Sequence, residues 1–257
     1  MNRAIRAFDR ADRYDAHAAT QHAVAQALAE RIAALDLPRA PRVLEIGCGT
    51  GFLTEALLPR IGGLWTVTDL APAMLDRCHA RIGERDDVRF RTMDGERPDL
   101  PHGSFDLICS SLAFQWFADL PGAIGRLTRL LAPGGRLLFA TMAENSFAEW
   151  RRAFAEAGLP AATPDYPSAE ALAAMIPGDA EGGIAEDRFV ERHADARAFL
   201  AALRGIGAQS PREGHRPLPI AALRRVMAAF DASGASVTYH VAYGVITRTA
   251  LRREAAA

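Results

Sequence analysis

Residues 43–51, with the sequence VLEIGCGTG, decide the fold of this chain. The apolar part, VLEI, is typical of a buried strand in a parallel sheet, and three glycines follow it at alternate positions. Because glycine has no β-carbon, the backbone can turn sharply there and approach a ligand closely. A helix that begins near Phe52 would point its free N–H groups at the same place. The pattern predicts a strand–turn–helix unit with a ligand at the turn.

The spacing of the glycines indicates which kind of ligand binds. A dinucleotide-binding turn needs a glycine or an alanine three residues after the second glycine, where helix and strand pack closely above the pyrophosphate. Phe52 occupies that position here. Glu45, two residues before the first glycine, would repel a phosphate and attract a cation. We therefore expect a positively charged nucleoside cofactor rather than a dinucleotide.

Further strands follow, and two of them run into acidic residues. Asp69, at the end of the second strand, lies where a carboxylate can accept hydrogen bonds from both ribose hydroxyls of a nucleoside. For Asp94, after the third strand, a ligand contact and a purely structural place in a turn fit equally well. The alternation of strands and helices is typical of βαβ units and predicts an α/β fold with a parallel sheet. The four strands expected after the first are 64–69, 88–93, 105–111 and 136–141.

The ordered set of motifs resembles the class I methyltransferases, whose first motif has the form Glu-x-Gly-x-Gly-x-Gly. That resemblance implies a Rossmann-like fold and the cofactor S-adenosylmethionine, which carries a sulfonium and an ammonium group and no phosphate. It also implies that the acid after the second strand binds the ribose and that the acid after the third strand binds the adenine amino group. The residues expected to contact the cofactor are Glu45, Gly47, Gly49, Gly51, Asp69, Leu70, Asp94, Gly95 and Ser110.

Composition excludes several other kinds of protein. With 257 residues, 49% hydrophobic and 24% charged, the chain can form one large core. The net charge of −1 gives no field for nucleic acid, and all 30 basic residues are arginine, which excludes Schiff-base and P-loop chemistry. The histidines and cysteines form no metal-binding or CxxC pattern. No run is apolar and long enough to span a membrane or to act as a signal core, so we expect a cytoplasmic protein with no metal, nucleic-acid partner or membrane contact.

The distribution of apolar residues divides the chain into four parts. In the N-terminal arm, Val24, Leu28 and Ile32 are spaced for one face of a helix at 18–34. The four expected parts are an N-terminal helical arm or lid at 1–39, a cofactor-binding core at 40–145, a helical substrate cap at 146–235, and a last strand with a tail at 236–257. Within the cap we expect helices at 147–157, 196–204 and 220–230 and a sixth strand near 187–193.

Four stretches resemble the malonyl-acyl-carrier-protein O-methyltransferases of biotin synthesis. Near the start lies Phe8-x-Arg10-Ala11-x-x-Tyr14-x-x-His17-x-x-x-Gln21, and SLAFQW follows the fourth strand at 111–116. The other two are LRGIGA at 203–208, with Glu213-Gly214 after it, and TYHVAYGVI at 238–246; these lie outside the general methyltransferase core. The resemblance implies a sheet that is mostly parallel with an antiparallel last strand. It also implies methyl transfer to the free carboxylate of a malonyl thioester on acyl carrier protein or coenzyme A.

The reaction implied by this resemblance needs no general base, because a malonate carboxylate is already ionised at neutral pH. Attack on a sulfonium methyl is an in-line displacement, so alignment and exclusion of water matter most. We expect Arg204 to grip the carboxylate, since a guanidinium can bind one oxygen or both. A solvated arginine, or a structural pair with Glu213, is the alternative for Arg204. The other residues expected at the acceptor are Tyr14 and His17 in the lid, Gln115 and Trp116 in the pocket wall, and Tyr239 and His240 on the last strand, where plain packing is the alternative.

Two other functions stay open on the sequence alone. One is methylation of another small carboxylate, as in trans-aconitate methyltransferases, which have a similar core. The other is a binding or hydroxylating protein that keeps the cofactor fold, like the assembly factors of respiratory complex I that resemble this family. The intact Glu45, Asp69 and glycine triplet favour a chain that still binds the cofactor. We expect a monomer or a weak dimer.

Overall fold

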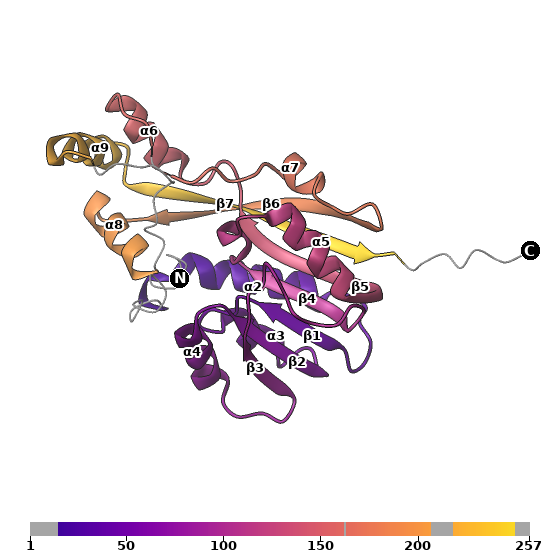
Figure 1. Cartoon of the computed structure of the whole chain (residues 1–257). Helices are drawn as coiled ribbons and strands as arrows, with labels where there is room; N and C mark the ends of the chain where they lie inside the picture. The colour runs from indigo at the N-terminus through magenta and orange to yellow at the C-terminus, as the bar shows by residue number, and fades with distance from the viewer. Residues whose placement is uncertain (1–14, 162, 207–217, 250–257) are drawn as a thin grey trace, which may run out of the picture.

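Seven strands form one sheet, and their arrangement confirms the predicted fold class (Figure 1). The structure is a computed structural model that describes residues 15–161, 163–206 and 218–249. The strand order is β3-β2-β1-β4-β5-β7-β6, with β1 to β5 parallel and β7 antiparallel to both of its neighbours. The strands are β1 Arg42–Ile46, β2 Leu64–Asp69, β3 Val88–Thr92, β4 Phe105–Ser111, β5 Leu131–Met142, β6 Ala180–Arg192 and β7 Ser236–Arg248.

The order of the strands reverses between β1 and β4. From β1 the chain adds β2 and β3 on one side, and then returns to add β4 and β5 on the other side. In open α/β sheets, ligands bind in the crevice outside the carboxyl ends of the strands at such a point. The topology therefore marks the carboxyl ends of β1 and β4 as the place to look for a site.

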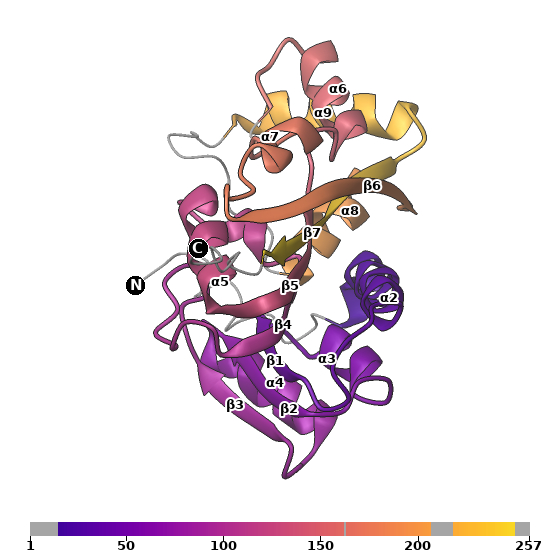
Figure 2. The ribbon, with the colours of Figure 1, turned by 90° about the vertical axis from the view of Figure 1, so that its right-hand side faces the viewer.

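Helices cover both faces of the sheet. Residues of α2, α3 and α4 pack on one face, and residues of α5 and α7 pack on the other; Figure 2 shows α2 and α5 on opposite sides of the strands. None of the helices in these ranges is long and apolar enough to cross a membrane. The helices are η1 Asp15–His17, α2 Ala19–Ala33, α3 Phe52–Leu57, α4 Pro72–Ile82, η2 Phe114–Trp116, α5 Leu120–Leu130, α6 Ala148–Glu156, α7 Ala169–Ala173, α8 Ala196–Gly205 and α9 Ile220–Ala232.

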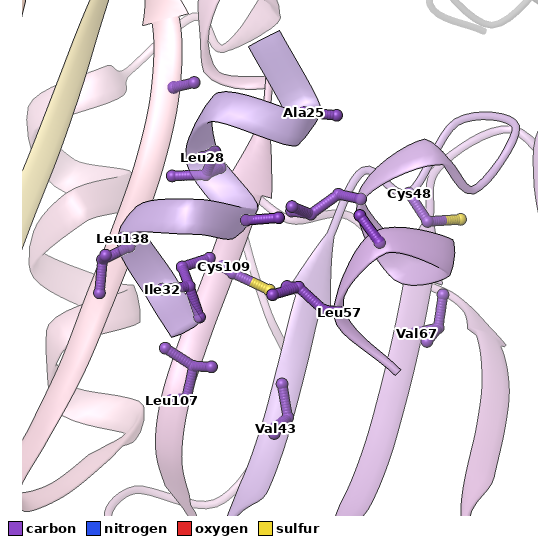
Figure 3. Close-up of a cluster of buried hydrophobic side chains, with 14 of the residues drawn as sticks. Ala25, Leu28, Ile32, Val43, Cys48, Leu57, Val67, Leu107, Cys109 and Leu138 are labelled. Atoms are coloured by element: carbon purple, nitrogen blue, oxygen red, sulfur yellow. The ribbon is translucent and has the colours of Figure 1, made fainter. Parts of the chain in front are cut away.

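Helix α2 confirms the helix predicted at 18–34. Its apolar stripe, Val24, Leu28 and Ile32, is fully buried. Figure 3 shows Leu28 and Ile32 facing Leu138 and Leu107 of the sheet. Each such side chain contributes roughly 1.5–3 kcal/mol through burial. The helix is thus fixed on the sheet along the same face as the glycine turn.

Three helices, α6, α8 and α9, form a cap at one end of the two longest strands (Figure 1). Strands β6 and β7 each have 13 residues, whereas β1 has 5, so the two extend past the core. The cap has its own buried cluster, which includes Trp150 of α6, Phe199 of α8 and Phe230 of α9. Because β5 leads directly into α6, the cap lies at the carboxyl ends of the parallel strands.

Strand β6 is longer than the sequence indicates. The prediction near 187–193 covers its second half, but pairing with β7 begins at Ala180. A β-carbon at Gly182 would lie 2.0 Å from the backbone oxygen of Val245, so only glycine allows the two strands to approach there. That glycine interrupts the apolar alternation by which strands are recognised. Strand β6 joins the cap to the same sheet as the core, so the sheet does not end at the predicted boundary between these parts. The four-part division of the chain stays a prediction.

Candidate functional site

A cavity of about 570 Å³ lies at the carboxyl ends of the parallel strands, between the sheet and the cap. Its volume is in the range of small-molecule sites. Two groups of lining residues differ in chemistry. The acidic half is lined by Glu45, Gly47, Gly49, Asp69, Leu70, Asp94, Gly95 and Glu96, and the aromatic half by Phe147, Trp150, Phe154, Tyr166, Phe199 and Tyr239.

The glycine turn after β1 brings two of its three glycines to the cavity. Gly47 has a φ of +68°, and a β-carbon there would lie 2.5 Å from that of Ala113, so the position requires glycine. Gly51 is outside the lining. A β-carbon on Gly51 would lie 2.9 Å from Sγ of Cys78, so this glycine lets α3 pack on α4. The structure thus gives Gly51 a packing role, and its contact with a ligand stays a prediction.

Glu45 is a buried acid at the end of β1. Its side chain is 1% exposed, and Oε2 accepts a hydrogen bond of 2.7 Å from the hydroxyl of Thr54. Burial raises the pKa of Glu45 to about 7, against the lowering effect of the Thr54 bond. A cation in the acidic half would stabilise the ionised carboxylate. The site therefore favours a positively charged ligand, as the sequence predicts.

Asp69 is held at the end of β2 by backbone N–H groups. Its Oδ2 accepts from the N–H of Gly49 at 2.9 Å, and Oδ1 accepts from the N–H of Ala71 at 2.8 Å. Burial raises the pKa of Asp69, while these backbone bonds oppose the shift. The carboxylate is thereby fixed across the glycine turn, with Leu70 beside it in the lining. A carboxylate in this fixed position can accept hydrogen bonds from hydroxyl groups of a ligand.

The two acids after β3 accept hydrogen bonds from backbone N–H groups of the protein. Asp94 is exposed, and its Oδ1 accepts from the N–H of Glu96 at 2.9 Å, which is the turn role that the sequence left open. Glu96 in turn accepts from the N–H groups of Ala118 and Asp119 at 2.9 and 3.1 Å. Asp94 still lines the cavity, as does Gly95, where a β-carbon would lie 2.3 Å from Ile46. Their contacts with a cofactor stay predictions.

Ser110 does not reach the cavity. It is fully buried in β4, and its hydroxyl donates a hydrogen bond of 2.8 Å to the backbone oxygen of Ile46. This bond ties β4 to β1 just before the glycine turn. The neighbouring Ser111 lines the cavity instead. Because successive strand residues point to opposite faces, an error of one position moved the expected contact out of the site.

Four of the residues expected at the acceptor do line the cavity. Gln115 and Trp116 lie in η2, and the amide of Gln115 is fixed by a 2.7 Å bond to the backbone oxygen of Leu112. Arg204 is exposed and also part of the lining, so it lies where the cavity meets solvent. Tyr239 is 4% exposed, and burial raises its pKa above the usual value. Among the described lining residues, Arg204 is the one that carries a positive charge.

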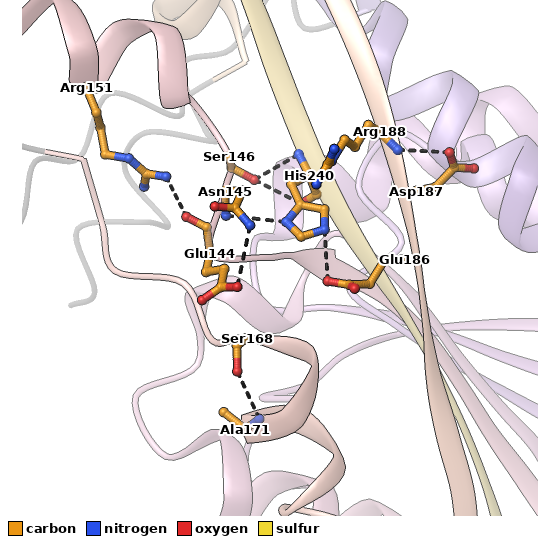
Figure 4. Close-up of polar contacts among 10 residues, drawn as sticks. All are labelled: Glu144, Asn145, Ser146, Arg151, Ser168, Ala171, Glu186, Asp187, Arg188 and His240. Carbon is orange, nitrogen blue, oxygen red and sulfur yellow. Dashed lines mark hydrogen bonds and ion pairs between the residues drawn. The ribbon is translucent and has the colours of Figure 1, made fainter.

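Two other expected residues lie outside the lining. His240 is 3% exposed; its Nε2 donates to Glu186 at 2.9 Å, and its Nδ1 accepts from the N–H of Asn145 at 3.3 Å (Figure 4). Both ring nitrogens are thus used in joining β7 to β6 and to the start of the cap. His17 packs against Gly205, where a β-carbon would lie 2.2 Å from its ring. The structure therefore gives both histidines packing roles, while Tyr14 lies outside the described residues.

Apart from Tyr239, the sequence analysis did not identify the residues of the aromatic half. Phe147, Trp150 and Phe154 follow the spacing of one helical face, which usually indicates core packing alone. Gln21 on α2 was likewise missed as a lining residue. It belongs to the N-terminal motif quoted above, but nothing in a single polar residue on a helix shows that it will face a cavity.

Residues 44–139 match the family model described as a methyltransferase domain. Over 246 residues the chain is 44% identical to a malonyl-[acyl-carrier protein] O-methyltransferase of Magnetococcus marinus, covering 94% of this chain and 91% of that protein. The chain belongs to the malonyl-[acyl-carrier protein] O-methyltransferase family. Membership of this family favours transfer to a malonyl thioester over the two alternative functions.

One relative of this O-methyltransferase family is a longer protein. The chain is 52% identical over 236 residues to the biotin biosynthesis bifunctional protein BioCD of Bordetella avium, covering 91% of this chain but 50% of that protein. The chain therefore spans half of that relative and nearly all of the Magnetococcus one. Identity in both extends over the arm and the cap, beyond the general methyltransferase domain.

Solved structures show the fold more widely. A protein from Bacillus halodurans C-125 superposes with a TM-score of 0.64 at 14% identity, covering 88% of this chain and 99% of that chain. An S-adenosylmethionine-dependent methyltransferase from Mesorhizobium loti gives a TM-score of 0.52 at 18% identity, covering 86% and 96%. At these identities the likeness shows the fold alone. It agrees with the α/β architecture that the strand order already indicates.

Proposed function

We propose that this protein transfers a methyl group from S-adenosylmethionine to the free carboxylate of a malonyl thioester carried by acyl carrier protein. The observation that carries the proposal is a single cavity with an acidic half at the glycine turn and an aromatic half under a cap, in a chain 44% identical to a malonyl-[acyl-carrier protein] O-methyltransferase. The cap lies outside residues 44–139, which match the general methyltransferase domain. We expect the reaction in the cytoplasm and the protein to be a monomer or a weak dimer.

The acidic half has the chemistry that S-adenosylmethionine requires. Buried Glu45 favours a cation, and the fixed carboxylate of Asp69 suits the two ribose hydroxyls. Asp94 and Gly95 would lie at the adenine. When bound, the cofactor would supply an electrophilic methyl group to the carboxylate oxygen, and the electron pair of the C–S bond would stay with sulfur. The glycine turn and Asp69 serve to hold the reacting centre in position.

The aromatic half would prepare the acceptor. An ionised malonyl carboxylate needs no base, but its reactivity falls when water solvates it. Phe147, Trp150 and Phe199 are buried side chains that exclude water from this half. We propose that Arg204, at the solvent edge, binds the carboxylate and that Gln115 and Trp116 form the wall opposite the cap. The residues thus act by alignment and desolvation, without a proton transfer.

Label transfer tests the proposal. The protein is incubated with methyl-labelled S-adenosylmethionine and either malonyl-acyl carrier protein, malonyl-coenzyme A or free malonate, and label is followed into a base-labile ester. We expect label on the malonyl thioesters. Label on free malonate and not on the thioesters would contradict the acceptor assignment, and failure of the protein to bind the cofactor would contradict the proposal as a whole.

Arg204 can be tested separately. Arg204→Ala should lower kcat/KM for the malonyl thioester by about 2 to 4 kcal/mol of transition-state stabilisation, while cofactor affinity stays near that of the wild type. Arg197→Ala is the matched control, since Arg197 is an exposed arginine of the same helix outside the lining. Equal kinetics for the two variants would remove Arg204 from the acceptor site.

A further inference from the structure

The aromatic half of the cavity contains hydrogen-bond donors as well as rings. Of its six residues, Trp150 has an indole N–H, and Tyr166 and Tyr239 each have a phenolic O–H. The hydroxyl of Tyr239 is hydrogen-bonded to Glu191 of β6. Within the part of the chain that the structure describes, neither Nε1 of Trp150 nor the hydroxyl of Tyr166 has a hydrogen-bond partner. The aromatic half therefore presents two donors that the protein itself does not use.

Both donors are in contact with open space. Among the described residues, two donors of the same types, Nε1 of Trp65 and the hydroxyl of Tyr243, are sealed from solvent without a partner and lie outside the lining. The donors of Trp150 and Tyr166 are not sealed in this way, although Trp150 is only 6% exposed. Burial raises the pKa of Tyr166 to about 12, so its hydroxyl lies among protein groups. The space that these two donors reach is therefore the cavity that their residues line.

The surrounding structure holds the two donors near each other. The ring of Tyr166 lies 6.4 Å from that of Phe147, the residue before α6. Trp150 follows Phe147 by three residues, so the two side chains are neighbours at the start of the helix. Next to Tyr166, the backbone oxygen of Pro167 accepts a hydrogen bond of 3.1 Å from the N–H of Glu144. Both donors thus lie beside Phe147, on segments fixed by packing and by the backbone.

The two halves of the cavity differ in hydrogen-bonding character. The carboxylates of the acidic half are acceptors, which suits a cofactor with ammonium and hydroxyl donors. The aromatic half offers the donors of Trp150 and Tyr166, with the charge of Arg204 at its edge. An ionised malonyl carboxylate has acceptors and no donor, and its burial among rings is costly unless donors replace the lost water. The aromatic half therefore suits a ligand with negative charge on oxygen.

We propose that the hydroxyl of Tyr166 and the indole N–H of Trp150 donate hydrogen bonds to the carboxylate of the malonyl group. This inference rests on the proposed function, because it assumes that acceptor. A carboxylate has about four lone-pair positions, so these two donors and one bond from Arg204 leave a position on the attacking oxygen free for the methyl group. The two residues then favour a malonyl over an acetyl thioester, whose terminal methyl group accepts no hydrogen bond.

Steady-state kinetics test the contact of Tyr166. Tyr166→Phe removes the O–H and keeps the ring, and it should raise KM for malonyl-acyl carrier protein about tenfold with little change in kcat, as expected for loss of one hydrogen bond to a charged group. Calorimetry should show unchanged affinity for S-adenosylhomocysteine. Tyr243→Phe is the matched control, since it removes an O–H that is sealed away from the cavity. An unchanged KM in Tyr166→Phe, or an equal loss of cofactor affinity, would overturn the inference.

A second ligand shows which group of the acceptor is bound. Acetyl-acyl carrier protein keeps the thioester and lacks the carboxylate. As a competitive inhibitor it should bind the wild type and Tyr166→Phe equally well. A loss of affinity for acetyl-acyl carrier protein as large as the loss for the malonyl form would place the contact at the thioester and so contradict the proposed contact with the carboxylate.

The pH profile separates binding from proton transfer. A phenol with a pKa of about 12 keeps its proton at neutral pH, so Tyr166 remains a donor there. The ratio of kcat/KM between the wild type and Tyr166→Phe should therefore be constant between about pH 6 and pH 9. A ratio that changes about tenfold per pH unit would show that Tyr166 transfers a proton, against the inference.

Trp150→Phe tests the second donor. It removes the indole N–H and should also raise KM for malonyl-acyl carrier protein, whereas Trp65→Phe, a control for lost ring volume in the core, should not. Melting temperatures separate loss of contact from loss of folding. An unchanged KM in Trp150→Phe would overturn the role of this donor. Wild-type protein that methylates no malonyl thioester would contradict the proposed function, whereas wild-type turnover with an unaffected Tyr166→Phe variant would contradict this inference alone.

Discussion

The acidic half and the aromatic half of the cavity are built in different ways. The acidic half comes from short segments at strand ends, where Asp69 and Asp94 accept hydrogen bonds from backbone N–H groups and Glu45 accepts one from the hydroxyl of Thr54. The aromatic half brings together Phe147 and Tyr239, which are far apart in the sequence yet have ring centroids 5.2 Å apart. The acidic side chains are thus held by hydrogen bonds from groups near the strand ends and the glycine turn. The chamber that excludes water depends on packing between distant segments.

The two halves also differ in what stabilises them. Asp69 is held by hydrogen bonds from main-chain N–H groups, which persist as long as the strand and turn exist. The aromatic half is continuous with the cap core, where the ring of Trp150 lies 5.2 Å from that of Phe199 and 5.1 Å from that of Phe230. We therefore expect loss of one ring in the cap to lower stability and use of the proposed acceptor together. Changes in the acidic half should act mainly on the cofactor.

The largest expected effect is on the cap. Trp150→Ala should lower the free energy of unfolding by about 3 to 5 kcal/mol, as is typical when a large core aromatic is removed. Cofactor affinity of the folded fraction should change little, while acceptor turnover is lost. Chemical denaturation and calorimetry measure the two quantities, with Ile220→Ala as a control, since Ile220 is 72% exposed. A loss of cofactor affinity as large as the loss of acceptor use would show that the halves are not separable.

The glycine turn should give the next largest effect. Gly47→Ala places a β-carbon against Ala113 at a φ of +68°, and we expect roughly 100-fold weaker cofactor binding, from strain and displacement of the turn. Gly83→Ala is the matched control, because Gly83 has a φ of +76° but no atoms near a β-carbon, and it lies outside the lining. If both variants bind the cofactor equally well, the shape of the glycine turn does not determine affinity.

The pKa of Glu45 predicts a pH dependence. Its pKa in the folded protein is raised to about 7 from 4.5, so between these values the native state holds a proton that the unfolded state has lost. The free energy of unfolding should therefore fall as pH rises through this window and level off above pH 7. Cofactor affinity should rise over the same range, by up to about tenfold per pH unit, as the carboxylate ionises. Calorimetry in buffers of different ionisation enthalpy should detect proton release, and Glu45→Gln should abolish it.

The smallest effect is expected where the arm meets the glycine turn. Oδ1 of Asp15 accepts from the hydroxyl of Thr50 at 2.8 Å, and its carboxylate pairs with Arg81, which donates to the backbone oxygen of Thr50 at 2.7 Å. Asp15 is about half exposed, so the pair is worth at most about 1 kcal/mol. Asp15→Asn should weaken cofactor binding a few-fold at low salt, as measured by calorimetry. Asp87→Asn breaks an exposed pair with Arg85 far from the turn and serves as the control.

Much of the acidic half could be predicted from particular residues. Gly47, Gly49, Glu45 and Asp69 line the cavity because a strand end fixes the position of the next two or three residues. Ser110 shows the limit of such reasoning, since one step along a strand changes the face to which a side chain points. His240 shows another limit. Its partner Glu186 is set by the register between β6 and β7, and strand spacing within β7 contains no information about it.

The sequence by itself determined the strand–turn–helix unit at 43–51, the presence of the parallel strands and the expectation of a cationic cofactor without phosphate. These follow from periodicity, glycine spacing and charge, which act over a few residues. The tertiary structure alone decided that Gln21 is among the residues lining the cavity, that Gly51 and His240 serve packing, and that rings of α6, α8 and β7 line the aromatic half. Those outcomes depend on contacts between segments far apart in the chain, and the packing of whole helices and strands determines these contacts.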